Sequence, residues 1–383
     1  MQLLSHIGLN IPRHGVREIL EEANKIPDAI HLEIGEPNVI TPSYIREAAT
    51  EAMNAGMTHY TPNAGLSSLR QSIVRHLNRK YDLVIDPKAI VVTPGAVTAL
   101  NATLLATVNS GEEVLIPDPS WPNYEQMLLG QGAIPVRYTL DPKSNFGLDV
   151  EELEGKVTTN TKAIIINSPG NPTGAVFSER EIKELITFAN KHKLLVISDE
   201  VYDGIVFEGE HINPLKYDQE NRVISIFGFS KNYAMTGWRV GYAVAPPYIA
   251  EIIAKLLEPM VSCASSVSQK AAEAALEGTD LFMEEMRESY RKRRDKVLEI
   301  FDEYGIQVKQ PQGAFYMLVD FSSVNLPQED VAMTLLKEEK VAVAPGSTFG
   351  PSTKHMVRIS FATDEEDLYE AAHRIGRFIQ RHS

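Results

Sequence analysis

The chain has a single cysteine, Cys263, and fewer basic than acidic residues among its 383. One cysteine can form no intrachain disulfide, and it excludes a metal site built from several cysteines. The 37 Lys and Arg against 51 Asp and Glu give a formal charge of −14, which disfavours a nucleic-acid-binding protein because phosphate neutralisation needs clustered basic side chains. No apolar run approaches the roughly 20 residues of a bilayer span, and Met1–Pro12 lacks the basic start and apolar core of a signal peptide. We therefore expect a cytoplasmic globular protein.

Several catalytic signatures are also absent. The sequence has no His-Glu-x-x-His, no Gly-x-Gly-x-x-Gly and no Gly-Lys-Ser/Thr phosphate loop, so a zinc hydrolase and a dinucleotide dehydrogenase are disfavoured and no metal is expected. The one basic run, residues 291–296, closely follows Glu284, Glu285 and Glu288. This pattern predicts the solvated face of a helix.

Short apolar runs alternate with helical patterns through the middle of the chain. The runs that predict buried strands are Ala89–Thr93, Glu113–Ile116, Ala163–Asn167, Leu194–Ser198, Val223–Phe227 and Val240–Ala245. Helical patterns lie between several of them, for example Val97–Val108 and Glu179–His192. Such alternation predicts an α/β fold with a mostly parallel sheet covered on both faces.

The last hundred residues carry a different pattern. A long charged helix is predicted over Leu281–Tyr304, followed by strand-like Phe315–Asp320, helix-like Asp330–Glu339 and strand-like Met356–Ser360. We expect a large domain of residues 34–280 and a smaller α+β domain formed by residues 1–33 together with 281–383.

Three polar segments follow predicted strands, where ligands bind in open α/β sheets. They are Asn167–Gly174, rich in proline and glycine, Ser198–Tyr202, and Gly228–Tyr233, which is followed by Thr236–Arg239. Each alone has an ordinary explanation: a rigid turn, a helix-capping carboxylate, or a lysine whose stem is buried and whose ammonium reaches water.

Together, these segments make the chain resemble the class I/II family of fold-type I pyridoxal-phosphate aminotransferases, the aspartate aminotransferase superfamily. The resemblance covers nearly the whole chain. It implies that Lys231 is the Schiff-base lysine and the general base, and that Asp199 faces the pyridine nitrogen and keeps it protonated. It also implies that Tyr202 and Asn171 hydrogen-bond the phenolic oxygen of the cofactor.

The resemblance places the cofactor phosphate at a helix start and an arginine. Arg239 matches the phosphate-binding arginine, and the backbone of Gly95, Ala96 and Val97 would receive the same phosphate. Trp121 matches the aromatic residue that stacks on the pyridine ring.

The remaining matches concern substrate and subunit contacts. Arg358 matches the arginine that clamps the substrate α-carboxylate, where a guanidinium fork suits two oxygens. Gly35 and Asn171 match residues near that carboxylate. Tyr60 matches a tyrosine that reaches the phosphate of the neighbouring subunit, which implies a homodimer with shared active sites.

The chain departs from the family pattern at two positions. Gly228 stands where many relatives carry a phosphate-binding serine, so Ser230 or a water is expected to supply that contact. Val97 stands where some aspartate-specific relatives carry a lysine, so aspartate is not assumed as substrate, and glutamate stays a plausible amino donor. Val97, Ile11 and Tyr60 are predicted to line the substrate pocket.

The resemblance implies transamination: an L-amino acid gives its nitrogen to pyridoxal 5′-phosphate, forming pyridoxamine phosphate, and a 2-oxo acid takes it in the second half of a ping-pong cycle. The alternative is a carbon–sulfur β-lyase on the same scaffold, because the cofactor supplies chemistry common to both. A ligand-sensing domain of a transcription regulator is disfavoured, since nothing before Gly35 is long or basic enough for a DNA-binding domain.

Overall fold

The computed structural model describes residues 3–13 and 15–383. Residues 1, 2 and 14 of the expected small domain, and the first two residues of the segment compared with a signal peptide, lie outside the described residues.

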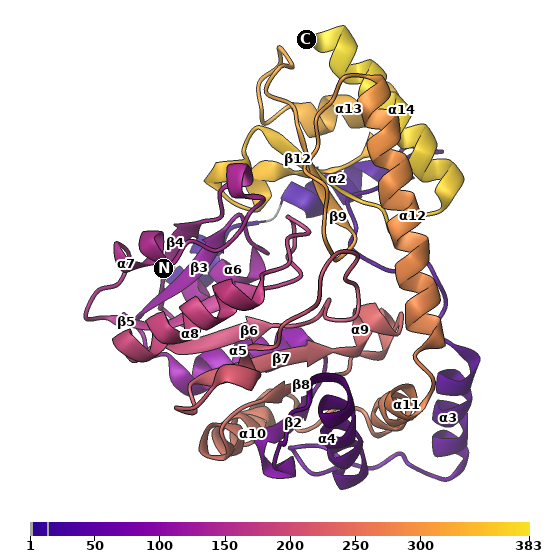
Figure 1. Ribbon diagram of the computed structural model, residues 1–383. Coiled ribbons are helices and arrows are strands. Elements are labelled where there is room, and N and C mark those ends of the chain that lie inside the picture. The colour runs from indigo at the N-terminus through magenta and orange to yellow at the C-terminus, as the bar shows by residue number, and fades with distance from the viewer. Residues whose placement is uncertain (1–2, 14) are drawn as a thin grey trace.

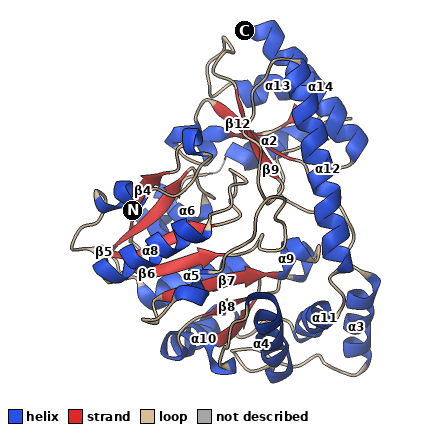
Figure 2. Cartoon of the chain, viewed as in Figure 1, coloured by secondary structure: helices blue, strands red, loops and turns tan. Residues whose placement is uncertain are grey.

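A seven-stranded sheet forms the centre of the molecule, in the order β2-β8-β7-β6-β5-β3-β4 (Figures 1 and 2). Its strands are β2 Ile90–Thr93, β3 Glu113–Asp118, β4 Ile134–Thr139, β5 Thr161–Asn167, β6 Leu195–Asp199, β7 Val223–Gly228 and β8 Gly241–Val244. Every neighbouring pair is parallel except the two that β8 makes with β2 and β7. The predicted α/β fold with a mostly parallel sheet is confirmed.

Strand β4 is the one member of this sheet that the sequence did not predict. It lies at the edge and pairs only with β3. Its residues are mostly half-buried or exposed, and it contains Pro135, a residue that edge strands tolerate. It therefore lacks the continuous apolar run that marked the buried strands.

Helices cover both faces of the sheet, and their apolar residues form separate cores with it. One face packs against α5 Ala96–Thr107, α6 Asn123–Gly130 and α10 Pro247–Val261. The other packs against α3 Ser43–Asn54, α4 Ser67–Tyr81, α7 Val150–Glu154, α8 Glu179–His192 and α11 Ser266–Glu277. Because both faces are covered, polar side chains gather at the remaining open edge of the sheet, where the parallel strands have their carboxyl ends.

A second core lies beyond that edge (Figure 1). It is built from α2 Gly15–Ala23, α12 Leu281–Glu303, α13 Val331–Glu339, α14 Glu365–His382 and two small sheets. One sheet is antiparallel, in the order β11-β12-β9, with bounds Ala344–Pro345, Met356–Ser360 and Tyr316–Asp320. The other pairs β1 Ile30–His31 with β10 Val341–Ala342 in parallel. Tyr202 and Ile205, which follow β6, join this core and so connect it to the large sheet.

The prediction that residues 291–296 form a solvated helix face is wrong at two positions of α12. Arg293 and Arg294 are buried, with 8% and 1% of their surface exposed. Arg294 donates to the Pro311 carbonyl and to Glu208, and Arg293 donates to the Thr363 carbonyl. Hydrogen bonds to these partners compensate the loss of hydration, so the guanidinium groups can lie inside.

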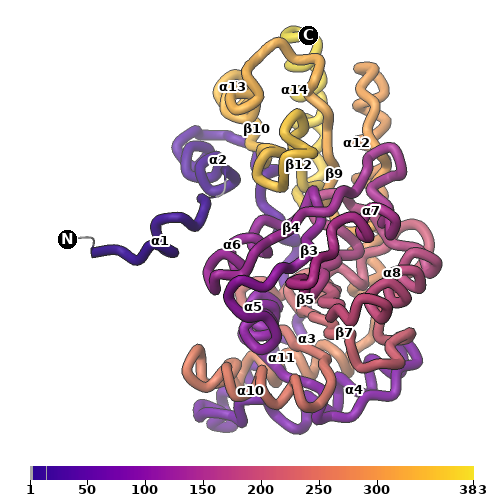
Figure 3. The backbone as a smooth tube through the Cα atoms, turned by 90° about the vertical axis from the view of Figure 1, so that its left-hand side faces the viewer, coloured from indigo at the N-terminus to yellow at the C-terminus, as the bar shows by residue number. Residues whose placement is uncertain are grey.

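The N-terminal segment projects from the body of the protein (Figure 3). Its short helix α1, His6–Asn10, has no buried residue. The segment contacts the large-sheet part through α6, where Gln126 Nε2 donates to the Pro12 carbonyl at 2.6 Å. Among the described helices, none has the length and apolar character that crossing a membrane requires.

Candidate active site

The carboxyl ends of β5 and β6 bring Asn167 and Asp199 side by side. The two residues are paired in register, and Asn167 Nδ2 donates to the Asp199 carbonyl at 2.9 Å. The Asn167 side-chain oxygen in turn accepts from the backbone N–H of Asn171 at 2.8 Å. The proline- and glycine-rich segment after β5 is thus held against the end of β6, as its position in a parallel sheet predicts.

Asp199 is buried and carries two hydrogen bonds. Its Oδ2 accepts from the Tyr124 hydroxyl at 2.6 Å, and its Oδ1 accepts from the Val201 N–H at 3.4 Å. Burial raises the pKa of Asp199 to about 6, although the Tyr124 hydrogen bond acts in the opposite direction. A carboxylate in this setting is stabilised by any cation that comes to face it.

Lys231 lies on α9, Phe229–Asn232, directly after β7. Its ammonium donates to the carbonyl of Gly35 and lies 5.8 Å from the centre of the Phe315 ring. Burial lowers the pKa of Lys231 to about 8; Glu36 opposes this shift, while the charges of Arg358 and Arg239 add to it. A larger share of this amine is neutral near pH 8 than in an ordinary lysine, which is the form that attacks a carbonyl carbon.

The backbone at Gly35 passes so close to the Tyr316 side chain that only glycine fits there. A Cβ built on it would lie 1.9 Å from the Tyr316 hydroxyl oxygen. That hydroxyl is paired with the Tyr202 hydroxyl at 2.8 Å, and both rings are buried. The glycine therefore lets the 33–36 segment pass over the Tyr202–Tyr316 pair and reach Lys231.

Arg358 lies on β12, and its side chain extends from the second core to the segments that carry Asn171 and Glu33. It is 5% exposed, and its guanidinium lies between the rings of Tyr316 and Phe349, with the centres 4.4 and 4.9 Å from Cζ. It donates to the Glu33 carbonyl and, at 3.0 Å, to Asn171 Oδ1, while its Nε has no partner in the described residues. A buried arginine with donor capacity to spare suits a carboxylate ligand.

Arg239 and the start of α5 converge at Gly95. The Arg239 Nη2 atom would lie 2.6 Å from a Cβ at that position, so only glycine fits there. Gly95 has φ of +79° and is the N-cap of α5, whose first N–H groups lack intrahelical acceptors. A guanidinium beside a helix start is a fitting receptor for an anion such as phosphate.

Trp121 stands at the edge of this region, just before α6. Its ring meets the Tyr124 ring edge-on, with the centres 5.5 Å apart. It is partly buried against the core of α5, α6 and α10. Trp121 is thereby connected through Tyr124 to Asp199.

Other predicted positions are less closely tied to this cluster. Tyr60 is 86% exposed and lies in the loop after α3, and Ile11 is exposed in the N-terminal segment. Ser230 and Val97 are partly buried. At Gly228, an added Cβ would lie 3.4 Å from Ala96 Cβ, so this position faces the start of α5.

Three residues that complete the cluster have no role predicted from the sequence: Tyr124, Asn167 and Tyr316. Tyr124 comes three positions after the predicted ring-stacking residue Trp121, and its backbone N–H donates to the Trp121 carbonyl at 3.2 Å. Tyr316 carried no such signal, because its contacts with Tyr202 and Arg358 are long-range in sequence.

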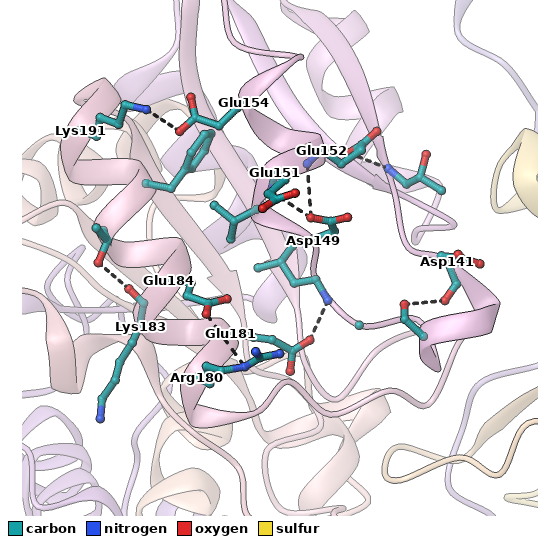
Figure 4. A pocket seen from close by; sticks show the side chains of 17 residues that line it. Asp141, Asp149, Glu151, Glu152, Glu154, Arg180, Glu181, Lys183, Glu184 and Lys191 are labelled. Carbon is teal, nitrogen blue, oxygen red and sulfur yellow. Dashed lines mark hydrogen bonds and ion pairs between the residues drawn. The ribbon is translucent and has the colours of Figure 1, made fainter.

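A separate open groove lies between α7 and α8, away from this cluster (Figure 4). Its walls carry surface ion pairs such as Lys191–Glu154 at 2.7 Å and Arg180–Glu184 at 3.9 Å. None of the predicted site residues lines it. Within the described part of the chain, no three His, Cys, Asp or Glu side chains are grouped so that they could hold a metal ion.

Comparison with known proteins identifies the family. The model of the aminotransferase class I and II family matches residues 27–375, so the chain belongs to that family and is an aminotransferase. The putative aminotransferase YugH of Bacillus subtilis is 39% identical over 380 residues, covering 99% of this chain and 98% of that protein. The aspartate aminotransferase of Pyrococcus abyssi is 40% identical, covering 95% of each chain.

Solved structures agree with this family membership. The aromatic aminotransferase of Pyrococcus horikoshii is 39% identical and superimposes with a TM-score of 0.90, covering 96% of this chain and 99% of that one. The chain therefore transfers amino groups between amino acids and 2-oxo acids. The β-lyase alternative receives no support, since the relatives are named aminotransferases.

Proposed function

We propose that this aminotransferase works with pyridoxal 5′-phosphate bound through Lys231 and alternates between the aldehyde and amine forms of the cofactor in a ping-pong cycle. The observation that carries the proposal is the position of the Lys231 amine. It is partly buried, its pKa is lowered to about 8, and it lies within electrostatic reach of Asp199, Arg239 and Arg358. Each of these three groups has the charge opposite to that of one part of the cofactor or substrate: Arg239 suits the phosphate, Asp199 the protonated ring nitrogen and Arg358 the substrate carboxylate.

The phosphate end would be held by Arg239, by the start of α5 (Gly95, Ala96 and Val97) and by Ser230. The close approach of Arg239 to Gly95 supports this assignment, because it brings a guanidinium and free N–H groups to one point. Ser230 belongs to the turn that carries Lys231 and is partly exposed, so it is available for the contact that Gly228 cannot make.

The ring end would face Asp199, with Trp121 against the ring and with Tyr202 and Asn171 at the phenolic oxygen. When bound, pyridoxal phosphate supplies an electron sink for the bond that breaks at the substrate α-carbon. Asp199 would stabilise the protonated ring nitrogen, and this cation would offset the cost of burying the carboxylate, which would contribute to cofactor binding. The buried Tyr202–Tyr316 pair supports the role of Tyr202, since it orients that hydroxyl.

The substrate carboxylate would be bound by Arg358, with Asn171 and Gly35 beside it. The hydrogen bond from Arg358 to Asn171 joins the carboxylate site to the cofactor site. Once the substrate has displaced Lys231 from the cofactor, its Nζ atom would take the proton from the substrate α-carbon and deliver it to the C4′ carbon of the cofactor. Its lowered pKa suits a base that gives and takes a proton near neutral pH.

Two features of the wider molecule belong to the proposal. We propose a homodimer with shared active sites, in which Tyr60 reaches the phosphate of the partner subunit. The exposed side chain of Tyr60 supports this, because it makes little contact within its own chain.

We also propose that the chain divides into a large domain of residues 34–280 and a small domain of residues 1–33 and 281–383. The separate core around α12 and α14 supports this division. The cytoplasmic location stays a prediction.

The replacement Lys231→Ala tests the central assignment. We expect it to abolish the absorbance of the lysine-bound cofactor and nearly all turnover, whereas Lys183→Ala, on the exposed side of α8, should change neither. An unchanged spectrum in Lys231→Ala would refute the proposal.

The substrate side chain can be assigned by a half-reaction screen. Relatives named for aspartate and for aromatic substrates match the chain about equally, at 40% and 39% identity. The amino acid that removes the cofactor absorbance with the highest second-order rate constant identifies the donor.

A further inference from the structure

A buried polar cluster lies beside the turn that carries Lys231. Its centre is Asp203, 6% exposed, four residues after Asp199. Asp203 Oδ2 accepts from Lys80 Nζ at 2.6 Å and from the Tyr81 hydroxyl, both at the end of α4. Asp203 Oδ1 accepts from Asn232 Nδ2 at 2.5 Å. One carboxylate therefore joins three segments that are far apart in the sequence.

The cluster holds a charge inside the protein at a definite place. Burial alone would raise the pKa of Asp203, but the charges of Lys80 and His211 and the hydrogen bonds from Lys80 and Tyr81 outweigh it and hold the pKa well below its usual value. Asp203 therefore stays ionised, and hydrogen bonds to an ionised acceptor are stronger than those between neutral groups.

Helix α9 needs such an anchor. It has four residues, and its N-cap, Gly228, offers no side chain to cap it. A single helical turn is unstable alone, because it fixes several backbone angles for little hydrogen bonding. Successive side chains on a turn point about 100° apart, and here Lys231 reaches the Gly35 carbonyl while Asn232 reaches Asp203.

We propose that Asp203 is a positioning residue for Lys231. Through Asn232 it fixes the turn that bears the amine relative to the segment that bears Asp199. The inference rests on the proposed function of Lys231 as the cofactor lysine, and it adds a requirement that lies outside the residues in contact with cofactor or substrate. A misplacement of about 1 Å can reduce the rate by on the order of 100-fold, so the cluster controls turnover without touching the reactants.

The variants Asn232→Ala and Asp203→Ala test the link from its two sides. Asn232→Ala leaves Asp203 paired with Lys80 and Tyr81, so it keeps the buried charge satisfied and folds even where Asp203→Ala does not. Ser178→Ala is the matched control, since it removes the capping box of α8 and lowers stability at a distance from the site.

Two readouts are measured. The first is kcat and KM of the holoenzyme with its preferred amino acid. The second is the rate at which the Lys231 amine of the cofactor-free protein is methylated by formaldehyde with cyanoborohydride as the reductant, read by peptide mass spectrometry. This readout is independent of turnover. We expect Asn232→Ala to lower kcat by on the order of 10- to 100-fold, with KM changed by less than about threefold, and to alter the labelling rate of Lys231.

The double variant separates positioning from general destabilisation. If Asp203 acts through Asn232, then Asp203→Ala with Asn232→Ala lowers kcat no further than Asp203→Ala alone, because both remove one link. Where Asp203→Ala does not fold, the single variant Asn232→Ala decides. Ser178→Ala should leave kcat and the labelling rate at their wild-type values.

Three results would overturn the inference: wild-type kcat and labelling rate in folded Asn232→Ala, a loss of kcat in Ser178→Ala as large as in Asn232→Ala, or additive losses in the double variant. If the wild-type protein showed no lysine-dependent cofactor absorbance, the proposed function would fail instead. The labelling of Lys231 would then still show whether Asn232 positions the amine.

Discussion

The Tyr124 hydroxyl donates a 2.6 Å hydrogen bond to the Asp199 carboxylate, and both groups are buried. The bond joins the start of α6 to the end of β6, and it brings Trp121, whose ring meets that of Tyr124, to the same region. Even with this hydrogen bond, burial raises the pKa of Asp199 to about 6. The charge of Asp199 near neutral pH therefore depends on the donor that Tyr124 supplies.

Removal of the Tyr124 hydroxyl should move the pH dependence of the enzyme. In cofactor-free Tyr124→Phe we expect the pKa of Asp199 to rise above its present value of about 6. A protonated cofactor ring would lower this pKa in the holoenzyme, but the loss of the Tyr124 donor still shifts the acidic limb of the kcat/KM profile to higher pH. A hydrogen bond to a charged group contributes about 1.5–3 kcal/mol, so kcat/KM at neutral pH should fall by roughly tenfold or more. The measurement is kcat/KM between pH 5 and 8.

Tyr138→Phe is the matched control for that variant. The Tyr138 hydroxyl is equally buried but donates to the Ile165 carbonyl, at 2.9 Å, and not to Asp199. It should destabilise the fold and leave the acidic limb in place. An acidic limb that moves equally in both variants would show that Tyr124 has no special role.

Asp199 should lower the stability of the cofactor-free protein. The pKa of Asp199 is raised from 3.8 to about 6 in the folded state, so the folded state binds the proton more tightly than the unfolded state does. Protonation of Asp199 therefore favours the folded state at low pH, and this stabilisation is lost as the pH rises from about 4 to 6. Above pH 6 the cost is at most about 3 kcal/mol.

We therefore expect Asp199→Asn to raise the free energy of unfolding of the cofactor-free protein by about 2 kcal/mol at pH 7 and by little at pH 4. Urea titrations at both pH values check this. The same variant should lose nearly all transamination. A lower stability at pH 7 would show that the ionised carboxylate is better solvated than its burial indicates.

The sequence predicted the parts of the fold and site that are local. Buried strands such as β5 and β7 appear as continuous apolar runs, and Asn171, Asp199 and Lys231 follow such runs directly, so that their meeting at one edge of the sheet was foreseeable. The edge strand β4 carries a mixed pattern and gave no such signal.

The remaining features depend on contacts between distant segments. Tyr316 meets Tyr202 across 114 positions, and Asp203 meets Tyr81 across 122. No local pattern marks a buried tyrosine or aspartate as a partner of a particular distant residue. The burial of Arg293 and Arg294 was missed for the same reason, since carbonyls and carboxylates from other segments make it possible.

Cofactor capture should depend on the protonation of Lys231. Only the neutral amine attacks an aldehyde, and the pKa of this amine is lowered to about 8 by burial. The second-order rate of pyridoxal phosphate uptake by the cofactor-free protein should therefore rise about tenfold per pH unit below pH 8 and level off above it. Stopped-flow absorbance measures this rate. A rise that continues to pH 10 would mean that the amine titrates like an exposed lysine.

Arg358 should bind the substrate through its shape as well as its charge. Its planar guanidinium lies between the Tyr316 and Phe349 rings and donates to Asn171, so its remaining donors are held in one orientation. In Arg358→Lys the ammonium keeps the charge but loses both the stacking and the two-pronged geometry. We expect KM for amino acids to rise by on the order of 100-fold, about 3 kcal/mol, with a smaller change in kcat.

Arg294→Lys controls for the loss of a buried guanidinium. Arg294 is as buried as Arg358, but it pairs with Glu208 and the Pro311 carbonyl in the second core. Its replacement should lower stability and leave KM unchanged. If Arg358→Lys lowered stability in the same way and kept the wild-type KM, Arg358 would be a structural residue that joins β12 to the segment at Glu33, and the substrate carboxylate would have to bind elsewhere.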